Sequence, residues 1–230
     1  MTTGAPRGAP DRRAPWITLE GIEGTGKSTQ IERLHGRLEA AGRASVRTRE
    51  PGGTALGGEL RRILLACTGS AIHPVTELLL YAADRAQHVT DVVLPALAHG
   101  TVVLCDRHLD ATLAYQGHGR ELGVAIVHEV HRVFPLDLRP DRTILLDLDP
   151  RAALERAHVR DSATGRTVTE GRFEAEPLAF HVRVREGYLA LAAEDPARIH
   201  VVDAAGGIDD VERRVVDALG DILPELRCAP

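Results

Sequence analysis

The stretch GIEGTGKS at residues 21–28 decides the fold of this chain. It matches the phosphate-binding pattern GxxxxGK[ST], and it stands between a short apolar strand at 16–20 and a periodic helix that runs from Lys27 to Gly42. Glycines in such a loop let backbone N–H groups converge on phosphate oxygens, and the helix N-terminus adds positive potential. The residues that this pattern predicts to bind ATP are Gly21, Gly24, Thr25, Gly26, Lys27, Ser28 and Thr29.

Lys27 is the only lysine of the chain, because the other 27 basic residues are all arginine. A position that keeps its lysine against such a bias needs a compact ammonium group, which a planar guanidinium does not replace. We therefore expect Lys27 to contact the β- and γ-phosphates of ATP and the Ser28 hydroxyl to ligate Mg²⁺. The single lysine also excludes a regulatory GTPase, since the guanine-binding segment Asn-Lys-x-Asp requires a second one.

Strands and helices are expected to alternate along the rest of the chain. The further strands are predicted at 45–48, 101–105, 143–148 and 199–202. The further helices are predicted at 54–64, at 74–99 (interrupted or bent near Pro95), from Pro150 onward with Asp149 as N-cap, at 174–193 and at 208–223. Residues 160–172 combine few apolar side chains with several Arg, Thr and Gly, which predicts a loop or flap. The alternation predicts an α/β protein: a three-layer P-loop fold with a parallel five-stranded sheet flanked by helices, and a mobile flap.

Length and composition limit the possible classes of protein. The length of 230 residues fits a single P-loop domain at 16–225, with the flap at about 156–172. Residues 1–15 are rich in Ala, Gly, Pro and Arg, which predicts a disordered leader. A net charge of −5 argues against a general nucleic-acid binder. Three cysteines without CxxC spacing argue against a disulfide scaffold or a zinc site and favour the reducing cytoplasm. No apolar run approaches the roughly 18 residues that span a membrane.

The apolar strand at 101–105 is followed directly by Asp106 and Arg107. An ATP-driven motor typically carries Asp-Glu at such a place, whereas this pair puts a carboxylate beside a guanidinium at the edge of the sheet where ligands bind in open α/β folds. Asp106 can hold Mg²⁺ through water, and Arg107 can bind a phosphate with two parallel hydrogen bonds. A plain surface ion pair is the alternative interpretation.

From Trp16 to Val202 the chain resembles the thymidylate kinase family. Besides the P-loop, the resemblance rests on TREPGGT at 48–54, LYAADR at 80–85, DRH with AYQG between 106 and 117, and the arginine-bearing flap. It implies that the chain phosphorylates dTMP to dTDP for dTTP biosynthesis, with ATP as phosphoryl donor and Mg²⁺ as cofactor. It also implies a homodimer formed through helices, for which the apolar face of 74–99 is the candidate.

The resemblance further implies how the acceptor nucleotide is held. Arg49 and Arg107 would bind its monophosphate, since two planar guanidinium groups neutralise a dianion well. Arg85 would donate to O4 of the pyrimidine, and Tyr115 would lie against the sugar and exclude a 2′-hydroxyl. The other residues implied on this side are Glu23, Pro51, Tyr81 (stacked on the base), Ala111, Thr112 and Gln116.

Members of the family differ in where they carry a catalytic arginine. Here Glu23 is followed by Gly24, so the P-loop supplies no guanidinium and the resemblance points to the flap. Arg160 and Arg166 are both candidates, and the sequence does not rank them. A guanidinium that closes over the transferred phosphoryl group stabilises the charge on its oxygens. The expected catalytic residues are Lys27, Glu23, Asp106, Arg107, Arg160 and Arg166, with Ser28 and Asp106 at the metal.

Three positions depart from the family pattern. Tyr81 replaces a Phe, His108 stands where Tyr is common, and Ala111 stands where Ser is usual beside the base. Two alternatives stay open at this point, the first of them because of Tyr81 and Ala111. One is a related kinase for another pyrimidine or modified deoxynucleoside monophosphate, and the other is a nucleotide-binding module without catalysis.

Overall fold

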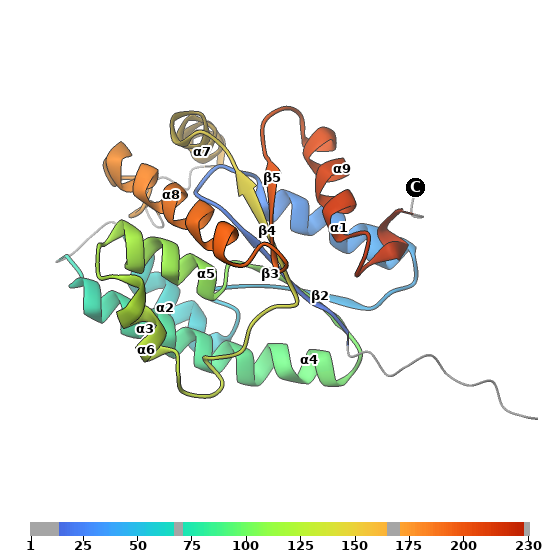
Figure 1. The fold of residues 1–230 in the computed structure, drawn as a ribbon, viewed down its shortest axis with the longest axis horizontal. Helices are drawn as coiled ribbons and strands as arrows, with labels where there is room; N and C mark the ends of the chain where they lie inside the picture. Colours follow the sequence, from blue (N-terminus) through green and yellow to red (C-terminus); the bar gives the residue numbers. More distant parts are fainter. Residues whose placement is uncertain (1–13, 67–70, 165–170, 228–230) are drawn as a thin grey trace, which may run out of the picture.

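Five parallel strands form the sheet of this protein. The computed structural model describes residues 14–66, 71–164 and 171–227. The strand order is β2-β3-β1-β4-β5, so β1, which leads into the P-loop, is central (Figure 1). The strands are β1 Trp16–Glu20, β2 Ser45–Arg49, β3 Val102–Asp106, β4 Arg142–Asp147 and β5 Ile199–Asp203. The predicted parallel five-stranded sheet is confirmed.

Helices cover both faces of the sheet, which gives the three predicted layers (Figure 1). One face carries α1 (Lys27–Ala40) and α9 (Ile208–Leu219). The opposite face carries α3 (Pro74–His88), α4 (Leu94–Ala98), α5 (Leu109–Thr112) and α8 (Leu178–Glu194). The remaining helices are α2 (Ala55–Leu65), α6 (Val124–Val130), α7 (Pro150–Thr164), the π-helical segments η1 (Val89–Val93) and η2 (Leu113–Gly119), and a short 3-10 turn, Pro224–Arg227.

The alternation of side chains along β1 explains the two buried layers. Ile17 and Leu19 belong to the same core cluster as Leu34 and Leu38 of α1. Trp16, on the other face, packs with residues of η1, α4 and β3. Such strands, covered on both faces, are typical of parallel sheets.

The predicted helix at 74–99 is interrupted, as expected, near Pro95. The α-helical pattern gives way to the π-helical turn η1, and α4 begins at Leu94 directly before the proline. Proline lacks an N–H and its ring clashes with the preceding turn, so the hydrogen-bond ladder has to shift there.

Several boundaries differ from the sequence prediction, among them the end of the last helix, which stops at Leu219 and not at 223. The expected loop at 160–172 is wrong for its first part, since α7 continues to Thr164; low apolar content does not distinguish a loop from a polar helix. Residues 165–170 lie outside the described residues. The following helix begins at Leu178 and not near 174, because Pro177 is the last non-helical residue before it.

The N-terminal boundary is also earlier than predicted. Ala14, assigned to the leader, is buried, and Pro15 accepts a backbone hydrogen bond from Val103. Residues 1–13 of the expected leader lie outside the described part of the chain. None of the helices in that described part has both the length and the apolarity needed to cross a bilayer.

Candidate active site

The P-loop conformation depends on glycines at two places where the backbone approaches its neighbours. Gly24 has φ 78°, and a Cβ at this position would lie 1.8 Å from the carbonyl oxygen of Ala153 in α7. Gly21 has φ 133°, and its Cβ would lie 2.5 Å from the carbonyl oxygen of Leu146. A side chain at either position would combine backbone strain with a steric clash. The loop is therefore packed directly on β4 and α7.

Lys27 and Ser28 open helix α1 directly behind this loop. Lys27 is buried, and its Nζ donates to the carbonyl oxygens of Gly21 at 2.9 Å and Ile22 at 2.8 Å. Burial, together with the charge of Arg107, lowers the pKa of Lys27 to about 8. Opposite the helix start, the Ser28 hydroxyl donates to Asp106 Oδ2 at 2.7 Å. The ends of β1 and β3 thus bring these groups together.

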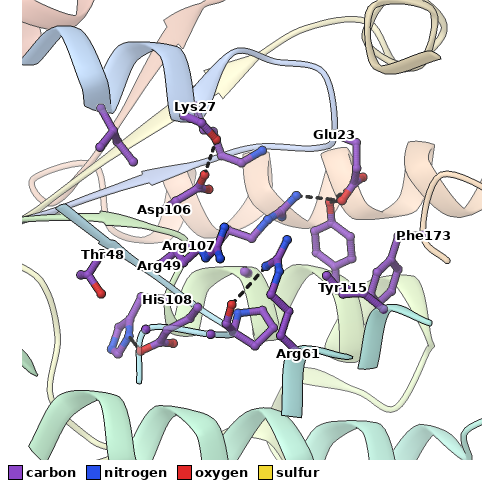
Figure 2. A pocket seen from close by; sticks show the side chains of 18 of the residues that line it. Glu23, Lys27, Thr48, Arg49, Arg61, Asp106, Arg107, His108, Tyr115 and Phe173 are labelled. Atoms are coloured by element: carbon purple, nitrogen blue, oxygen red, sulfur yellow. Dashed lines mark hydrogen bonds and ion pairs between the residues drawn. The ribbon is translucent and has the colours of Figure 1, made fainter. Parts of the chain in front are cut away.

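A cavity of about 850 Å³ lies along the carboxyl edge of the sheet. Figure 2 shows Arg49, Arg61 and Arg107 pointing into it, with Glu23 and Tyr115 close to Arg107 and Asp106 beside the start of α1. The predicted site residues that line it are Glu23, Gly24, Gly26, Lys27, Ser28, Thr29, Arg49, Pro51, Tyr81, Arg85, Asp106, Arg107, Ala111, Thr112, Tyr115 and Gln116.

Two predicted site residues of the described part of the chain, Gly21 and Thr25, are not among those that line the cavity. Gly21 and Thr25 support the loop, and the Thr25 hydroxyl donates to the carbonyl oxygen of Ile22 at 3.0 Å. Arg160 lies in α7, but its side chain is not described, and Arg166 lies outside the described residues.

Arg107 occupies a strained backbone conformation, with φ 71° in a residue that is not glycine. Its N–H donates to the carbonyl oxygen of Leu19 at 3.1 Å, and the next N–H, that of His108, donates to the Glu20 carboxyl at 2.7 Å. Its guanidinium donates to Glu23 at 2.8 Å and lies 4.7 Å from the centre of the Tyr115 ring. Such strain persists only where the surroundings fix it, and it is frequent at functional sites.

Glu23 connects the P-loop to this arginine and to the aromatic wall of the cavity. The Tyr115 hydroxyl donates to both carboxyl oxygens of Glu23, at 2.7 and 2.8 Å. Burial acts to raise the pKa of Glu23, but the charges of Arg107 and Lys27 outweigh it and lower that pKa overall. Glu23 is thus an ionised hydrogen-bond acceptor between the P-loop and the wall of the cavity that Arg107 and Tyr115 form.

Arg85 is almost fully buried and is held by a network of polar groups. Its Nε donates to Glu50 at 2.8 Å, its Nη1 to His131 Nε2 at 2.7 Å, and its Nη2 to Thr112 Oγ1 at 2.9 Å and to the His108 carbonyl oxygen at 3.0 Å. Four of its five N–H groups are therefore used within the protein. Glu50 and His131, which fix this guanidinium, were not predicted from the sequence.

The comparisons with known proteins agree with this geometry. The family model described as Thymidylate kinase matches residues 19–215. The thymidylate kinase of Solidesulfovibrio magneticus is 52% identical over 208 residues, which cover 90% of this chain and 100% of the relative. That of Syntrophotalea carbinolica is 52% identical over 200 residues, covering 87% and 92%. The chain belongs to the thymidylate kinase family.

A solved structure supports the same assignment at the level of the fold. The crystal structure of thymidylate kinase from Ehrlichia chaffeensis superposes with a TM-score of 0.72 at 28% identity and covers 90% of this chain and 100% of that chain. The α/β fold and the family resemblance predicted from the sequence are both confirmed.

Arg61 is a pocket residue that the sequence analysis missed. It comes from α2, and its Nη1 donates to the carbonyl oxygen of Pro51 at 3.1 Å (Figure 2). Its neighbour Arg62 is mainly exposed and pairs with Glu59 on the same helix. Adjacent residues of a helix point in directions about 100° apart, and here Arg61 lines the cavity whereas Arg62 does not.

The oxygen ligands at the start of α1 suit Mg²⁺. Ser28 and Asp106 supply one hydroxyl and one carboxylate on the cavity wall, and this ion usually takes few protein ligands and completes its shell with water and phosphate oxygens. Within the described ranges there is no cluster of three or more His, Cys, Asp or Glu that could hold a metal on its own. The donor set therefore fits a nucleotide-bound Mg²⁺ better than a resident metal.

Proposed function

We propose that this chain transfers the γ-phosphoryl group of ATP to a 5′-phosphate oxygen of dTMP, giving ADP and dTDP. The observation that carries the proposal is that one cavity is lined both by the P-loop and by Arg49 and Arg107. Two phosphorylated ligands can therefore meet end to end within it. The acceptor phosphate is already an oxyanion near neutral pH, so the reaction depends on positioning and charge neutralisation more than on a general base.

On the donor side, the backbone N–H groups of the P-loop and the Lys27 ammonium would hold the phosphates of ATP. The Ser28 hydroxyl and the Asp106 carboxylate would hold Mg²⁺, directly or through water, and bound Mg²⁺ supplies further neutralisation of phosphate charge. Burial and the charge of Arg107 lower the pKa of Lys27. Phosphate oxygens at this position would favour the charged form.

On the acceptor side, Arg49 and Arg107 would bind the 5′-phosphate of dTMP. Register supports this pairing, because Arg49 and Asp106 are opposite each other at the ends of β2 and β3, and Arg107 follows. Tyr115, fixed by its hydrogen bonds to Glu23, would lie against the sugar. The base would lie near Tyr81, Arg85, Ala111, Thr112 and Gln116.

A flap arginine would complete the transition-state contacts. Arg160 and Arg166 remain the candidates, and substituting each by alanine would rank them. The catalytic one should lower kcat with little change in KM, since its contact forms with the transferring phosphoryl group.

Substitution of Lys27 by alanine tests the proposal. We expect kcat/KM for dTMP to fall by about a hundredfold or more, because the ammonium is the compact cation at the transferred phosphate. Arg33→Ala is the matched control on the same helix, since Arg33 pairs with Asp209 and Glu212 away from the cavity. A Lys27→Ala enzyme that kept turnover within roughly tenfold of the parent would contradict the proposed role.

Ala111 and Tyr81 depart from the family pattern and therefore motivate a second candidate substrate, which is another pyrimidine or modified deoxynucleoside monophosphate. A coupled ADP assay with dTMP, dUMP, dCMP and the thymine ribonucleotide separates these possibilities. A clear preference for dTMP supports the main proposal, and a higher kcat/KM for another monophosphate would replace it. A homodimer and a cytoplasmic location also remain predictions.

A further inference from the structure

Glu77 is a fully buried carboxylate in the first turn of α3, directly behind the cavity wall. Its Oε1 accepts from Gln116 Nε2 at 2.7 Å and from Arg120 Nε at 3.3 Å. Its Oε2 lies 2.7 Å from Arg172 Nη1, as an ion pair outside hydrogen-bond geometry. Two guanidinium groups from separate segments therefore compensate the charge of Glu77, and the Gln116 amide is placed against the same carboxylate.

The contact with Glu77 determines which way the Gln116 amide faces. Gln116 belongs to η2 and lines the cavity, although it is only 1% exposed. An ionised carboxylate can only accept hydrogen bonds, so the amide has to turn its NH₂ group toward Glu77. The opposite orientation would place two acceptor oxygens against each other at the same distance. The carbonyl oxygen of Gln116 is therefore left for the cavity.

We propose that Glu77 is a positioning residue that fixes Gln116 as a hydrogen-bond acceptor and thereby selects pyrimidines that carry a proton on N3. The inference rests on the proposed function, in which the base lies beside Gln116. Thymine and uracil carry N3–H, whereas N3 of cytosine has only a lone pair. A site whose buried polar group is left unpaired by the wrong ligand rejects that ligand strongly.

The fixed guanidinium of Arg85 supplies the complementary group. Its four hydrogen bonds within the protein leave one N–H on Nη1, and arginine cannot act as an acceptor. A donor from Arg85 and an acceptor from Gln116 match the O4 and N3–H edge of thymine. Cytosine presents an amino group and a lone pair at the same two places, so both contacts would be lost.

The test compares Glu77→Gln with the parent enzyme on dTMP, dUMP and dCMP. The new amide can accept or donate, so both orientations of Gln116 become possible. We expect the kcat/KM ratio of dTMP to dCMP to fall by about tenfold or more, with the ratio of dTMP to dUMP unchanged, because both of these bases carry N3–H. Glu176→Gln is the matched control, since Glu176 pairs with Arg120 at 2.6 Å from the exposed side. It should leave both ratios unchanged.

A second variant keeps the inference testable if Glu77→Gln does not fold. Gln116→Met is similar in size and removes the amide, so it should lower the ratio of dTMP to dCMP in the same way. Unchanged ratios in the folded variants would overturn the inference while dTMP kinase activity stood. A parent that used dCMP as well as dTMP would also overturn it. A parent active on neither would overturn the proposed function along with it.

Discussion

Glu20 at the end of β1 and Arg107 directly after β3 are both held in energetically unfavourable states. Arg107 has a positive φ, and Glu20 is a buried carboxyl that accepts from the His108 N–H at 2.7 Å and from the Tyr188 hydroxyl at 2.7 Å. Tyr188 is in turn 3.3 Å from Arg107 Nη1. Glu20 therefore supports the backbone after Arg107 and also Tyr188, which contacts the Arg107 side chain. The cost in stability thus lies next to an arginine for which we propose a phosphate-binding role.

The Glu20 carboxyl predicts a pH-dependent stability. Burial, followed by the charge of Asp110, raises the pKa of Glu20 from 4.5 to about 8. Between these values the folded state keeps a proton that the unfolded state has released, so stability falls as pH rises, by at most about 1.4 kcal/mol per pH unit. Glu20→Gln does not titrate, so its free energy of unfolding should change less between pH 6 and 8.

Chemical denaturation at the two pH values measures this difference. Glu59→Gln, an exposed carboxyl on α2, is the control and should keep the slope of the parent. Burial is the main cause that raises the pKa of Asp84 to about 6, so this residue contributes to the pH dependence of stability chiefly below pH 6. Equal slopes for Glu20→Gln and the parent would show that Glu20 is ionised in the folded protein at pH 6.

Arg61 is expected to contribute to binding of the acceptor phosphate. Arg61→Ala should raise KM for dTMP by about tenfold or more, because the free energy of one charge-assisted hydrogen bond corresponds to a change of about this size. The effect on KM for ATP should be much smaller. Arg62→Ala removes the same charge one position along α2, outside the cavity, and should behave like the parent. Steady-state kinetics with each substrate varied decide the matter, and equal KM values for dTMP in the two variants would remove Arg61 from the site.

At the scale of elements, the P-loop and α7 form one packed unit. Gly24→Ala would force a Cβ to within 1.8 Å of the Ala153 carbonyl oxygen at φ 78°. We expect a loss of about 2 kcal/mol or more in stability and weaker binding of an ATP analogue. Thermal unfolding and a nucleotide titration measure the two effects.

Gly58→Ala is the control for that substitution. It lies in α2 with nothing within 4 Å of its Cβ position, so alanine should stabilise the helix slightly. A Gly24→Ala protein with the parent's unfolding temperature would mean that the loop and α7 can separate without cost.

The elements that sequence alone predicts are those with a local signature. The P-loop, its flanking strand β1 and the buried strands β3 and β4 follow from short apolar runs and fixed glycine spacing. The π-helical segment η2 and helix α6 have no such signature and were missed. The loop predicted from residue 160 is helical as far as Thr164, and a polar helix and a loop share the same composition over residues 160–164.

The site shows the same division between local and non-local information. Lys27 and Ser28 are fixed by the pattern that contains them. Arg85, by contrast, is held by Glu50 and His131, which are 35 and 46 residues away in sequence. No periodicity encodes such a contact, because it arises only when the loop after β2, helix α3 and the C-terminal end of α6 come together in the fold.

At the scale of the whole molecule, the active-site cavity and the expected dimer surface are separate features. Helix α3 presents Arg85 and Tyr81 to the cavity, whereas Val75 and Leu79, four residues apart, are 42% and 52% exposed. Helix α2, which packs on α3, also exposes Leu56 and Ile63. Exposed apolar residues grouped on adjacent helices are typical of an interface, and this group supports the predicted homodimer.

The predicted dimer can be tested without altering the cavity. Leu79→Asp would place a charge in the centre of an apolar contact, where an unpaired carboxylate is strongly unfavourable. We expect the parent to have twice the chain mass of 24.8 kDa in light scattering after gel filtration, and Leu79→Asp to have the mass of one chain. Ile208→Asp changes an equally exposed side chain at the start of α9, on the opposite face of the sheet, and should remain a dimer. If Leu79→Asp kept the dimer mass, the interface would have to lie elsewhere, and a monomeric parent would exclude the homodimer, because the exposed face of α2 and α3 would then be solvated.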